Sequence, residues 1–313
     1  MIRDLVRVMC LVWGICAALY GLRCLYVCYR EQLPYDPPRP LYNTAGICYI
    51  NSVIQLLRTA WYDYRLRGEV AEQVELPVYK KLNALTKQVM TLYDHSTSSL
   101  ESDMIAIERA VYEYDDRFDM GGLENGLWWY VMSALLGRPV GLVDLAPDIV
   151  PSAEFGIVAC PSWLPGVEKE EYVTEGCSDV HALLRRVLSR EIKALPRFFA
   201  IIGVQWDTEV NMFMQVSYRK FPLYFIARQR GAIQTFTYEC IGILAASEAH
   251  AVAFVRRRDS WYICDDSFIE PVTQEFMNKA AQSGHLPIPH PAPNNVAVPT
   301  VLLYKRCTGC CIT

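Results

Sequence analysis

The sequence LYNTAGICYINSVIQLL, residues 41–57, places a polar turn that contains Gly46 directly before an apolar helical run, with Cys48 at the junction. The amino end of a helix carries the positive end of the helix dipole, which favours the thiolate, the nucleophilic form of cysteine. A lone cysteine before an apolar helix is also compatible with a small buried hydrophobic residue. Whether Cys48 is a reactive nucleophile or a buried hydrophobic residue has to be judged from the rest of the sequence.

The part of the chain from residue 41 to about residue 140 is predicted to be helical. Apolar residues recur there in alternating steps of four and three, which stacks them on one helix face. These residues are Val78, Leu82, Leu85, Val89 and Leu92. Two further apolar helices are predicted over residues 127–136 and 180–192.

From Arg197 onward the pattern changes to short β-branched and aromatic runs, which are typical of strands in a largely antiparallel sheet. The predicted strands cover residues 198–204, 212–218, 223–227, 235–244, 251–256, 261–264 and 300–304. The proline-dense residues 285–299 are expected to form one surface loop. A helical first part followed by a strand-rich second part predicts an α+β domain.

Two distant segments resemble the signature boxes of the ubiquitin-specific protease family. Residues 43–55 match its cysteine box in the asparagine five positions before the cysteine, the Cys-Tyr-x-Asn-Ser run and a later glutamine. Residues 238–267 are similar to its histidine box. Shorter matches at residues 195–197, 221–223 and 301–306 follow in the family's order, so the resemblance extends from residue 41 to residue 306.

The resemblance implies a papain-like fold, in which a helical thumb carrying the nucleophile helix packs on a largely antiparallel palm and fingers sheet. It also implies a thiol protease that removes ubiquitin or a ubiquitin-like modifier from lysine. Cys48 would be the nucleophile, His250 the base and Asp265 the group that orients the base. Asn43 would donate to the developing oxyanion, and Asp266 would support the site.

The sequence departs from the family at positions that border the channel for the modifier's Gly-Gly tail. Ala249 and Ala251 replace the glycine and tyrosine that flank the histidine, and residues 45–47 replace Gly-Asn-Thr before the nucleophile. A methyl group at Ala249 would crowd the channel, whereas loss of the aromatic ring at Ala251 would open space. A degenerate member that binds ubiquitin-like proteins without cutting them is therefore an alternative. A structural membrane protein with accidental motif matches is a third.

No metal or other cofactor is expected. Between the two boxes only Cys160 and Cys177 occur, with His181 nearby, which falls short of the paired cysteines of a zinc site. The Cys-x-x-Cys at residues 307–310 lacks a partner pair, and no glycine-rich phosphate loop appears.

The composition excludes other protein classes. With 52% hydrophobic residues the chain is not intrinsically disordered, and a formal charge of −4 argues against binding to nucleic acid. The five cysteines of the body are too scattered for a disulfide framework, which favours a reducing compartment.

The amino-terminal residues are predicted to anchor the protein in a membrane. Residues 8–29 are almost uncharged and long enough for one transmembrane helix. The expected organisation is a membrane segment at residues 1–30, a proline-rich linker at 31–40, the catalytic domain at 41–306 and a cysteine-rich tail at 307–313. We expect a single-pass protein with its catalytic domain in the cytosol, and we note candidate lipidation sites at Cys24, Cys28 and Cys310.

Overall fold

The computed structural model describes the fold for much of the chain beyond residue 36. The described residues are 13, 20, 21, 37–43, 46–61, 77–95, 100–113, 127, 128, 131, 155–159, 180, 184, 195–202, 204–207, 212–215, 220–228, 235–247, 250–288 and 295–307. The chain divides into two compact units, Met1–Pro37 and Pro38–Thr313. The second unit holds every helix and strand discussed below.

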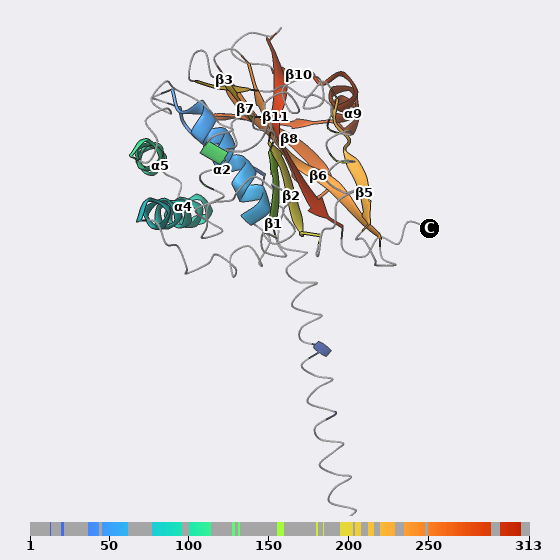
Figure 1. The fold of residues 1–313 in the computed structure, drawn as a ribbon, viewed down its shortest axis with the longest axis horizontal. Helices are drawn as coiled ribbons and strands as arrows, with labels where there is room; N and C mark the ends of the chain where they lie inside the picture. The colour runs from blue at the N-terminus through green and yellow to red at the C-terminus, as the bar shows by residue number, and fades with distance from the viewer. Residues whose placement is uncertain are drawn as a thin grey trace, which may run out of the picture. The chain divides into compact units, whose positions relative to one another are not determined.

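Three helices cover one face of the sheet: α2 (Cys48–Trp61), α4 (Pro77–His95) and α5 (Glu101–Tyr112). Helix α2 lies directly on the sheet, and α4 and α5 pack outside it (Figure 1). The apolar spacing at residues 78–92 correctly predicts α4, because Leu82 and Val89 are buried. Residues 127, 128 and 131, and residues 180 and 184, are helical within the two other predicted helices.

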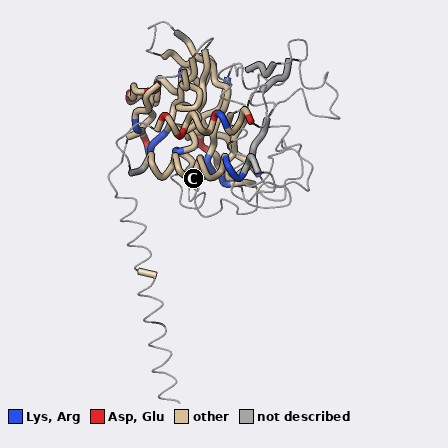
Figure 2. Tube along the Cα trace, turned by 90° about the vertical axis from the view of Figure 1, so that its left-hand side faces the viewer, with Lys and Arg blue, Asp and Glu red and all other residues tan. Residues whose placement is uncertain are grey.

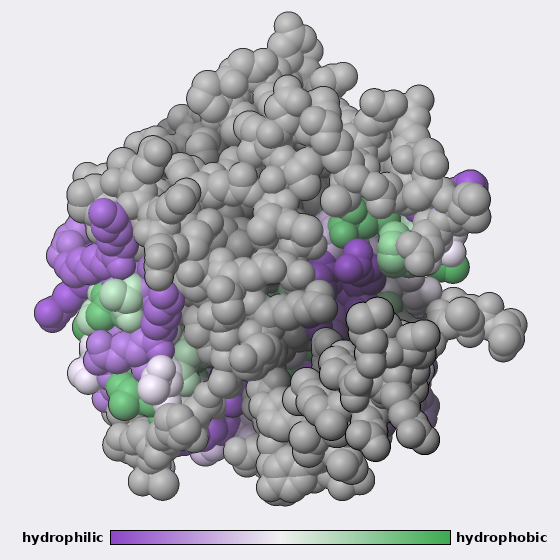
Figure 3. Space-filling view, turned by 90° about the horizontal axis from the view of Figure 1, so that it is seen from below, coloured by the Kyte–Doolittle hydropathy of each residue, from purple (hydrophilic) through white to green (hydrophobic). Residues whose placement is uncertain are grey.

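The outward side of α4 and α5 is hydrophilic (Figure 3). On the side that faces the viewer in Figure 2, α4 carries basic residues and α5 mostly acidic ones. The Lys81 ammonium lies 2.6 Å from the Glu113 carboxylate. Exposed pairs of this kind contribute little to stability, so apolar packing on the inward side holds these helices in place.

The sheet has the order β1-β2-β11-β6-β7-β8-β9, with β10 paired to β11 and β5 paired to β6. All of these pairs are antiparallel except β1–β2. A separate ribbon pairs β3 with β4. The strand bounds are β1 Phe155–Ala159, β2 Phe198–Ile202, β3 Val204–Asp207, β4 Met212–Gln215, β5 Tyr224–Arg228, β6 Thr235–Ala246, β7 Ala251–Arg257, β8 Ser260–Asp265, β9 Phe268–Val272, β10 Leu286–Ile288 and β11 Asn295–Arg306. This mixture of helices and antiparallel strands confirms the α+β prediction.

The opposite face of the sheet carries helix α9 (Gln274–Ser283). Thr273 caps its amino end by accepting a hydrogen bond from the Phe276 N–H, and Gly284 ends it with φ 72°. Two hydrophobic clusters result, one between the sheet and α2, α4 and α5, the other between the sheet and α9. The central strands are therefore buried on both faces.

The prediction of a surface loop at residues 285–299 is wrong. Leu286–Ile288 form β10, and β11 begins at Asn295. Leu286, Ile288 and Ala297 are buried, and their burial outweighs the proline content of the segment. Pro287 is tolerated because β10 is short and pairs on one side only, where a missing N–H need not break a ladder.

A close approach fixes α2 on the sheet. A Cβ atom at Gly242 of β6 would lie 2.0 Å from Cδ1 of Leu56 in α2. The strand is irregular here, because the pairing of β11 with β6 shifts register between Leu303 and Tyr304. A glycine at this position lets the helix lie against the strand backbone.

Among the described residues, no helix is both long enough and apolar enough to span a membrane. The predicted membrane segment at residues 8–29 lies outside the described residues, apart from Trp13, Tyr20 and Gly21. The tail at residues 308–313, which includes Cys310, also lies outside them, as do Cys160, Cys177 and His181.

Candidate active site

Cys48 is the first residue of α2, the helix that packs across β7. The turn before it contains Gly46 with φ 72°, a conformation that suits glycine. Ile47 and Ile50 on either side are buried, whereas Cys48 itself is only partly buried. The flanking residues thus anchor the helix start, and the thiol remains accessible.

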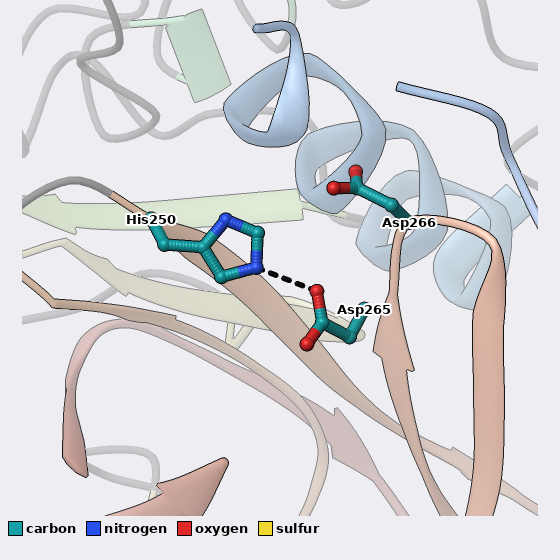
Figure 4. A group of neighbouring side chains, drawn as sticks. All are labelled: His250, Asp265 and Asp266. Atoms are coloured by element: carbon teal, nitrogen blue, oxygen red, sulfur yellow. Dashed lines mark hydrogen bonds and ion pairs between the residues drawn. The ribbon is translucent and has the colours of Figure 1, made fainter. Parts of the chain in front are cut away.

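His250 and Asp265 meet across the hairpin formed by β7 and β8. His250 immediately precedes β7, and Asp265 is the last residue of β8. The Nε2 atom of His250 lies 2.5 Å from Oδ1 of Asp265, and the two side chains face one another in Figure 4. Asp265 is buried with a side-chain exposure of 4%, so its attraction for the imidazole is poorly screened.

The side chain of Cys48 lies close enough to His250 to act on the imidazole. The Asp265 carboxylate, which accepts a hydrogen bond from the imidazole, and then the Cys48 side chain raise the pKa of His250 to about 10, against the opposing effect of burial. At neutral pH the imidazole is therefore held in its protonated form.

Asp266 binds two asparagines at once. Its Oδ2 accepts a hydrogen bond of 2.9 Å from Nδ2 of Asn43, and its Oδ1 accepts one of 2.6 Å from Nδ2 of Asn51. The Oδ1 atom of Asn43 in turn accepts a 2.8 Å hydrogen bond from the backbone N–H of Ile47. Asp266 therefore links the segment before the helix, the helix itself and the β8–β9 turn.

The backbone at Asp266 supports this bridge. Its φ of 52° lies in the left-handed region, which aspartate tolerates better than most residues, and its carbonyl accepts a 2.9 Å hydrogen bond from the Leu41 N–H. Burial raises the pKa of the Asp266 carboxyl, and the hydrogen bonds from Asn51 and Asn43 oppose that rise.

Ligand atoms of His250, Asp265 and Asp266 all lie within 4.8 Å of one another, which is a spacing that a metal ion could bridge. Three of their ligand atoms already have other partners, however: Oδ1 of Asp265 bonds to His250, and both Asp266 oxygens bind asparagine amides. Figure 4 shows the Asp266 carboxylate lying on the side of α2, apart from the His250–Asp265 pair. These bonds favour a relay of hydrogen bonds over a metal site.

The structure thus brings together five of the seven residues singled out from the sequence, namely Asn43, Cys48, His250, Asp265 and Asp266. Ala251 is the first residue of β7 and is buried in the core under α2. Ala249 lies outside the described residues. The sequence reasoning missed a role for Asn51, although Asn51 belongs to the Cys-Tyr-x-Asn-Ser run and lies about one helical turn from Cys48.

The segment at residues 37–43, which leads to Cys48, is tied down by a ring of hydrogen bonds at Arg39. The Arg39 N–H donates to the Tyr93 hydroxyl at 2.6 Å, that hydroxyl donates to Oε1 of Gln55 at 2.8 Å, and Nε2 of Gln55 donates to the Arg39 carbonyl at 2.5 Å. The Arg39 guanidinium also donates to the Tyr93 carbonyl at 3.0 Å. Gln55 lies in α2 and Tyr93 in α4, so both helices hold the segment that carries Asn43.

The fold resembles solved structures of a deubiquitinating module. The SAGA Ubp8/Sgf11/Sus1/Sgf73 DUB module matches with a TM-score of 0.55 and 12% identity, over 94% of this chain and 74% of the matched chain. The same module bound to ubiquitin aldehyde matches with a TM-score of 0.52 and 12% identity, over 94% and 76%. No protein-family model and no curated protein matches the sequence. The structural likeness supports a fold of the ubiquitin-specific protease type.

Proposed function

We propose that this protein is a cysteine-type deubiquitinase, a thiol hydrolase that removes ubiquitin or a ubiquitin-like modifier from lysine side chains. The observation that carries the proposal is the hydrogen bond between His250 and Asp265, beside Cys48 at the start of α2, whose side chain raises the pKa of His250. A nucleophile, a base and an orienting acid in this order are what hydrolysis by a thiol requires. The likeness of the fold to a deubiquitinating module supports ubiquitin or a relative of it as the modifier.

The first half of the proposed reaction uses Cys48, His250 and Asp265. Because Asp265 engages Nε2 of His250, Nδ1 is the nitrogen left to share a proton with the Cys48 sulfur. The thiolate attacks the carbonyl carbon of the modifier's last residue and forms a C–S bond. The imidazolium then donates its proton to the lysine nitrogen as the C–N bond breaks, which releases the free amine and leaves a thioester on Cys48.

The second half hydrolyses the thioester. His250, now neutral, takes a proton from a water molecule whose oxygen attacks the thioester carbonyl. The C–S bond breaks, the thiolate–imidazolium pair is restored, and the modifier leaves as a carboxylic acid that releases its proton to the solvent. In both halves Asn43 donates an Nδ2 hydrogen to the oxyanion, a contribution that can amount to about 3 kcal/mol.

A fluorogenic ubiquitin substrate and a ubiquitin carrying a carboxy-terminal electrophile together test this proposal. The wild-type protein should hydrolyse the first and become covalently labelled at Cys48 by the second. A panel of ubiquitin-like probes would then identify the modifier. Absence of both turnover and labelling with every probe in the panel would disprove the proposal.

The alternative function is capture of a ubiquitin-like protein without cleavage. It is favoured by Ala251, a small buried residue where the family resemblance leads us to expect an aromatic ring. A binder of this kind would give a measurable dissociation constant for the free modifier and no covalent adduct at Cys48. An enzyme would give both.

We also propose that the protein acts at a membrane, with residues 8–29 as the anchor and the catalytic domain in the cytosol, where ubiquitin is available. The uncharged sequence of this segment supports the proposal. Trp13 and Tyr20 are helical and expose 78% and 69% of their surface, as lipid-facing or interfacial aromatic residues would.

A further inference from the structure

We infer that Asn51 is a positioning residue for the oxyanion donor Asn43, and that it acts through the carboxylate of Asp266, which both asparagines bind. The inference rests on the proposed function, because Asn43 stabilises an oxyanion only if Cys48 attacks a carbonyl group. It adds a residue of the nucleophile helix itself to the oxyanion machinery.

Asn51 is placed for this role by α2. It is buried, with 2% of its surface exposed, and its Nδ2 donates to Oδ1 of Asp266 at 2.6 Å. Its Nδ2 also lies 3.4 Å from the carbonyl oxygen of Tyr42, the residue before Asn43. Asn51 therefore contacts the oxyanion segment both directly and through Asp266.

The orientation of the Asn43 amide is fixed from two sides. The Ile47 N–H requires an acceptor, so the atom 2.8 Å from it is the Asn43 oxygen. Nδ2 must then face Asp266, where one of its two hydrogens is used. The second hydrogen is left for the substrate, and its direction depends on where the Asp266 carboxylate is held.

The hydrogen bond that Asp266 accepts from Asn43 depends on the negative charge of the Asp266 carboxylate. Burial and the nearby Asp265 raise the pKa of Asp266, whereas Asn51, Asn43 and His250 lower it. Removing the Asn51 donor takes away the largest of the interactions that lower the pKa of Asp266. A protonated Asp266 would have a hydroxyl that donates, and a carboxyl group no longer held by Asn51 would be free to rotate away from Asn43.

The variant Asn51→Leu tests the inference, since leucine has the same branching at Cγ as asparagine, with somewhat larger methyl groups, but no donor. Hydrolysis of a ubiquitin substrate should lose roughly 10- to 100-fold in kcat with little change in KM, less than the about 100- to 1,000-fold lost when an oxyanion donor itself is removed. The acid limb of the kcat profile should move to higher pH. Alkylation of Cys48 by iodoacetamide forms no oxyanion and should keep its wild-type rate.

Thr86→Val is the matched control. Thr86 is buried in α4 and donates to the Leu82 carbonyl at 2.8 Å, so its replacement removes a buried hydrogen bond away from Asp266. This variant should retain wild-type kcat. If Asn51→Leu slows alkylation as much as hydrolysis, Asn51 supports the nucleophile or the fold, and the inference is wrong.

A double-mutant cycle separates positioning from general damage. If Asn51 acts through Asn43, adding Asn51→Leu to Asn43→Ala should lower kcat little further. Additive losses would overturn the inference.

A second readout does not depend on turnover. In Asn51→Leu, but not in Thr86→Val, the NMR signals of the Asn43 side-chain amide should shift. Should the wild-type protein cleave nothing, the proposed function fails, yet these signals still decide whether Asn51 positions Asn43. Unchanged Asn43 signals in Asn51→Leu would refute the inference.

Discussion

Gly242 of β6 and Leu56 of α2 approach so closely that a Cβ atom on the glycine would lie 2.0 Å from the leucine Cδ1. The helix that presents Cys48 is seated at this contact. Leu56 is completely buried, so its side chain has little room to withdraw. The position of the nucleophile therefore depends on a residue that has no side chain.

Gly242→Ala should destabilise the protein by about 1–3 kcal/mol, the usual cost of overpacking a core. Denaturant unfolding measures this loss. Adding Leu56→Ala should recover part of it, although Leu56→Ala alone would itself cost about 2–5 kcal/mol because it leaves a cavity. Strictly additive losses in the double variant would show that the two side chains do not compete for the same space.

Cys48→Ala should abolish both hydrolysis and labelling by a ubiquitin electrophile. Its free energy of unfolding should change little, because the thiol is only partly buried. Steady-state kinetics and intact-mass spectrometry check the chemistry, and circular dichroism checks the fold. Full activity in this variant would rule out Cys48 as the nucleophile.

Asp265→Asn should lower the pKa of His250 from about 10, because the hydrogen bond from Asp265 is the strongest contribution that raises it. NMR titration of the imidazole measures the change directly. The effect of the Cys48 side chain remains in this variant, so some elevation of the pKa above the ordinary value of 6.5 should persist. An unchanged titration midpoint would mean that Asp265 does not hold the proton.

The stability conferred by His250 should depend on pH. A pKa raised in the folded state means that folding binds the proton more tightly, so the stabilisation is complete below pH 6.5 and is lost as the pH rises through about 10. The difference in free energy of unfolding between wild type and His250→Gln should therefore shrink over that interval. A constant difference from pH 6 to pH 10 would contradict this.

Deletion of residues 1–30 should release the protein into the soluble fraction of a cell lysate. Cys310→Ser alone should not, because we expect residues 8–29 to be the principal anchor. Fractionation after carbonate extraction is the measurement. Continued membrane attachment of the truncated protein would make the carboxy-terminal cysteines the main anchor.

The sequence predicted those features that depend on local patterns. The helix around Leu82 and Val89 follows from apolar spacing, and the β7–β8 hairpin follows from two β-branched and aromatic runs separated by a short turn. Local patterning failed at residues 285–299, where burial of Leu286 and Ile288 against the sheet overrides the prolines. That burial depends on distant strands and cannot be read from the segment itself.

In the candidate site too, the features that depend on local sequence were predicted and those that depend on distant contacts were not. The order of Cys48, His250 and Asp265 in the sequence suggested a triad, because each occurs in a recognisable neighbourhood. The bridge from Asp266 to Asn43 and Asn51 was not foreseen, since it spans more than 200 positions and depends on a left-handed backbone turn at Asp266. Such a conformation is set by tertiary contacts.

The ring of hydrogen bonds around Arg39 has a mechanical consequence. A force applied to the chain before Arg39 is transmitted to α2 through Gln55 and to α4 through Tyr93. Asn43 lies a few residues after this ring of hydrogen bonds, so the force does not reach it. Movement of the backbone at Arg39 is therefore resisted by two helices at once, and the Asn43 amide keeps its direction toward Asp266.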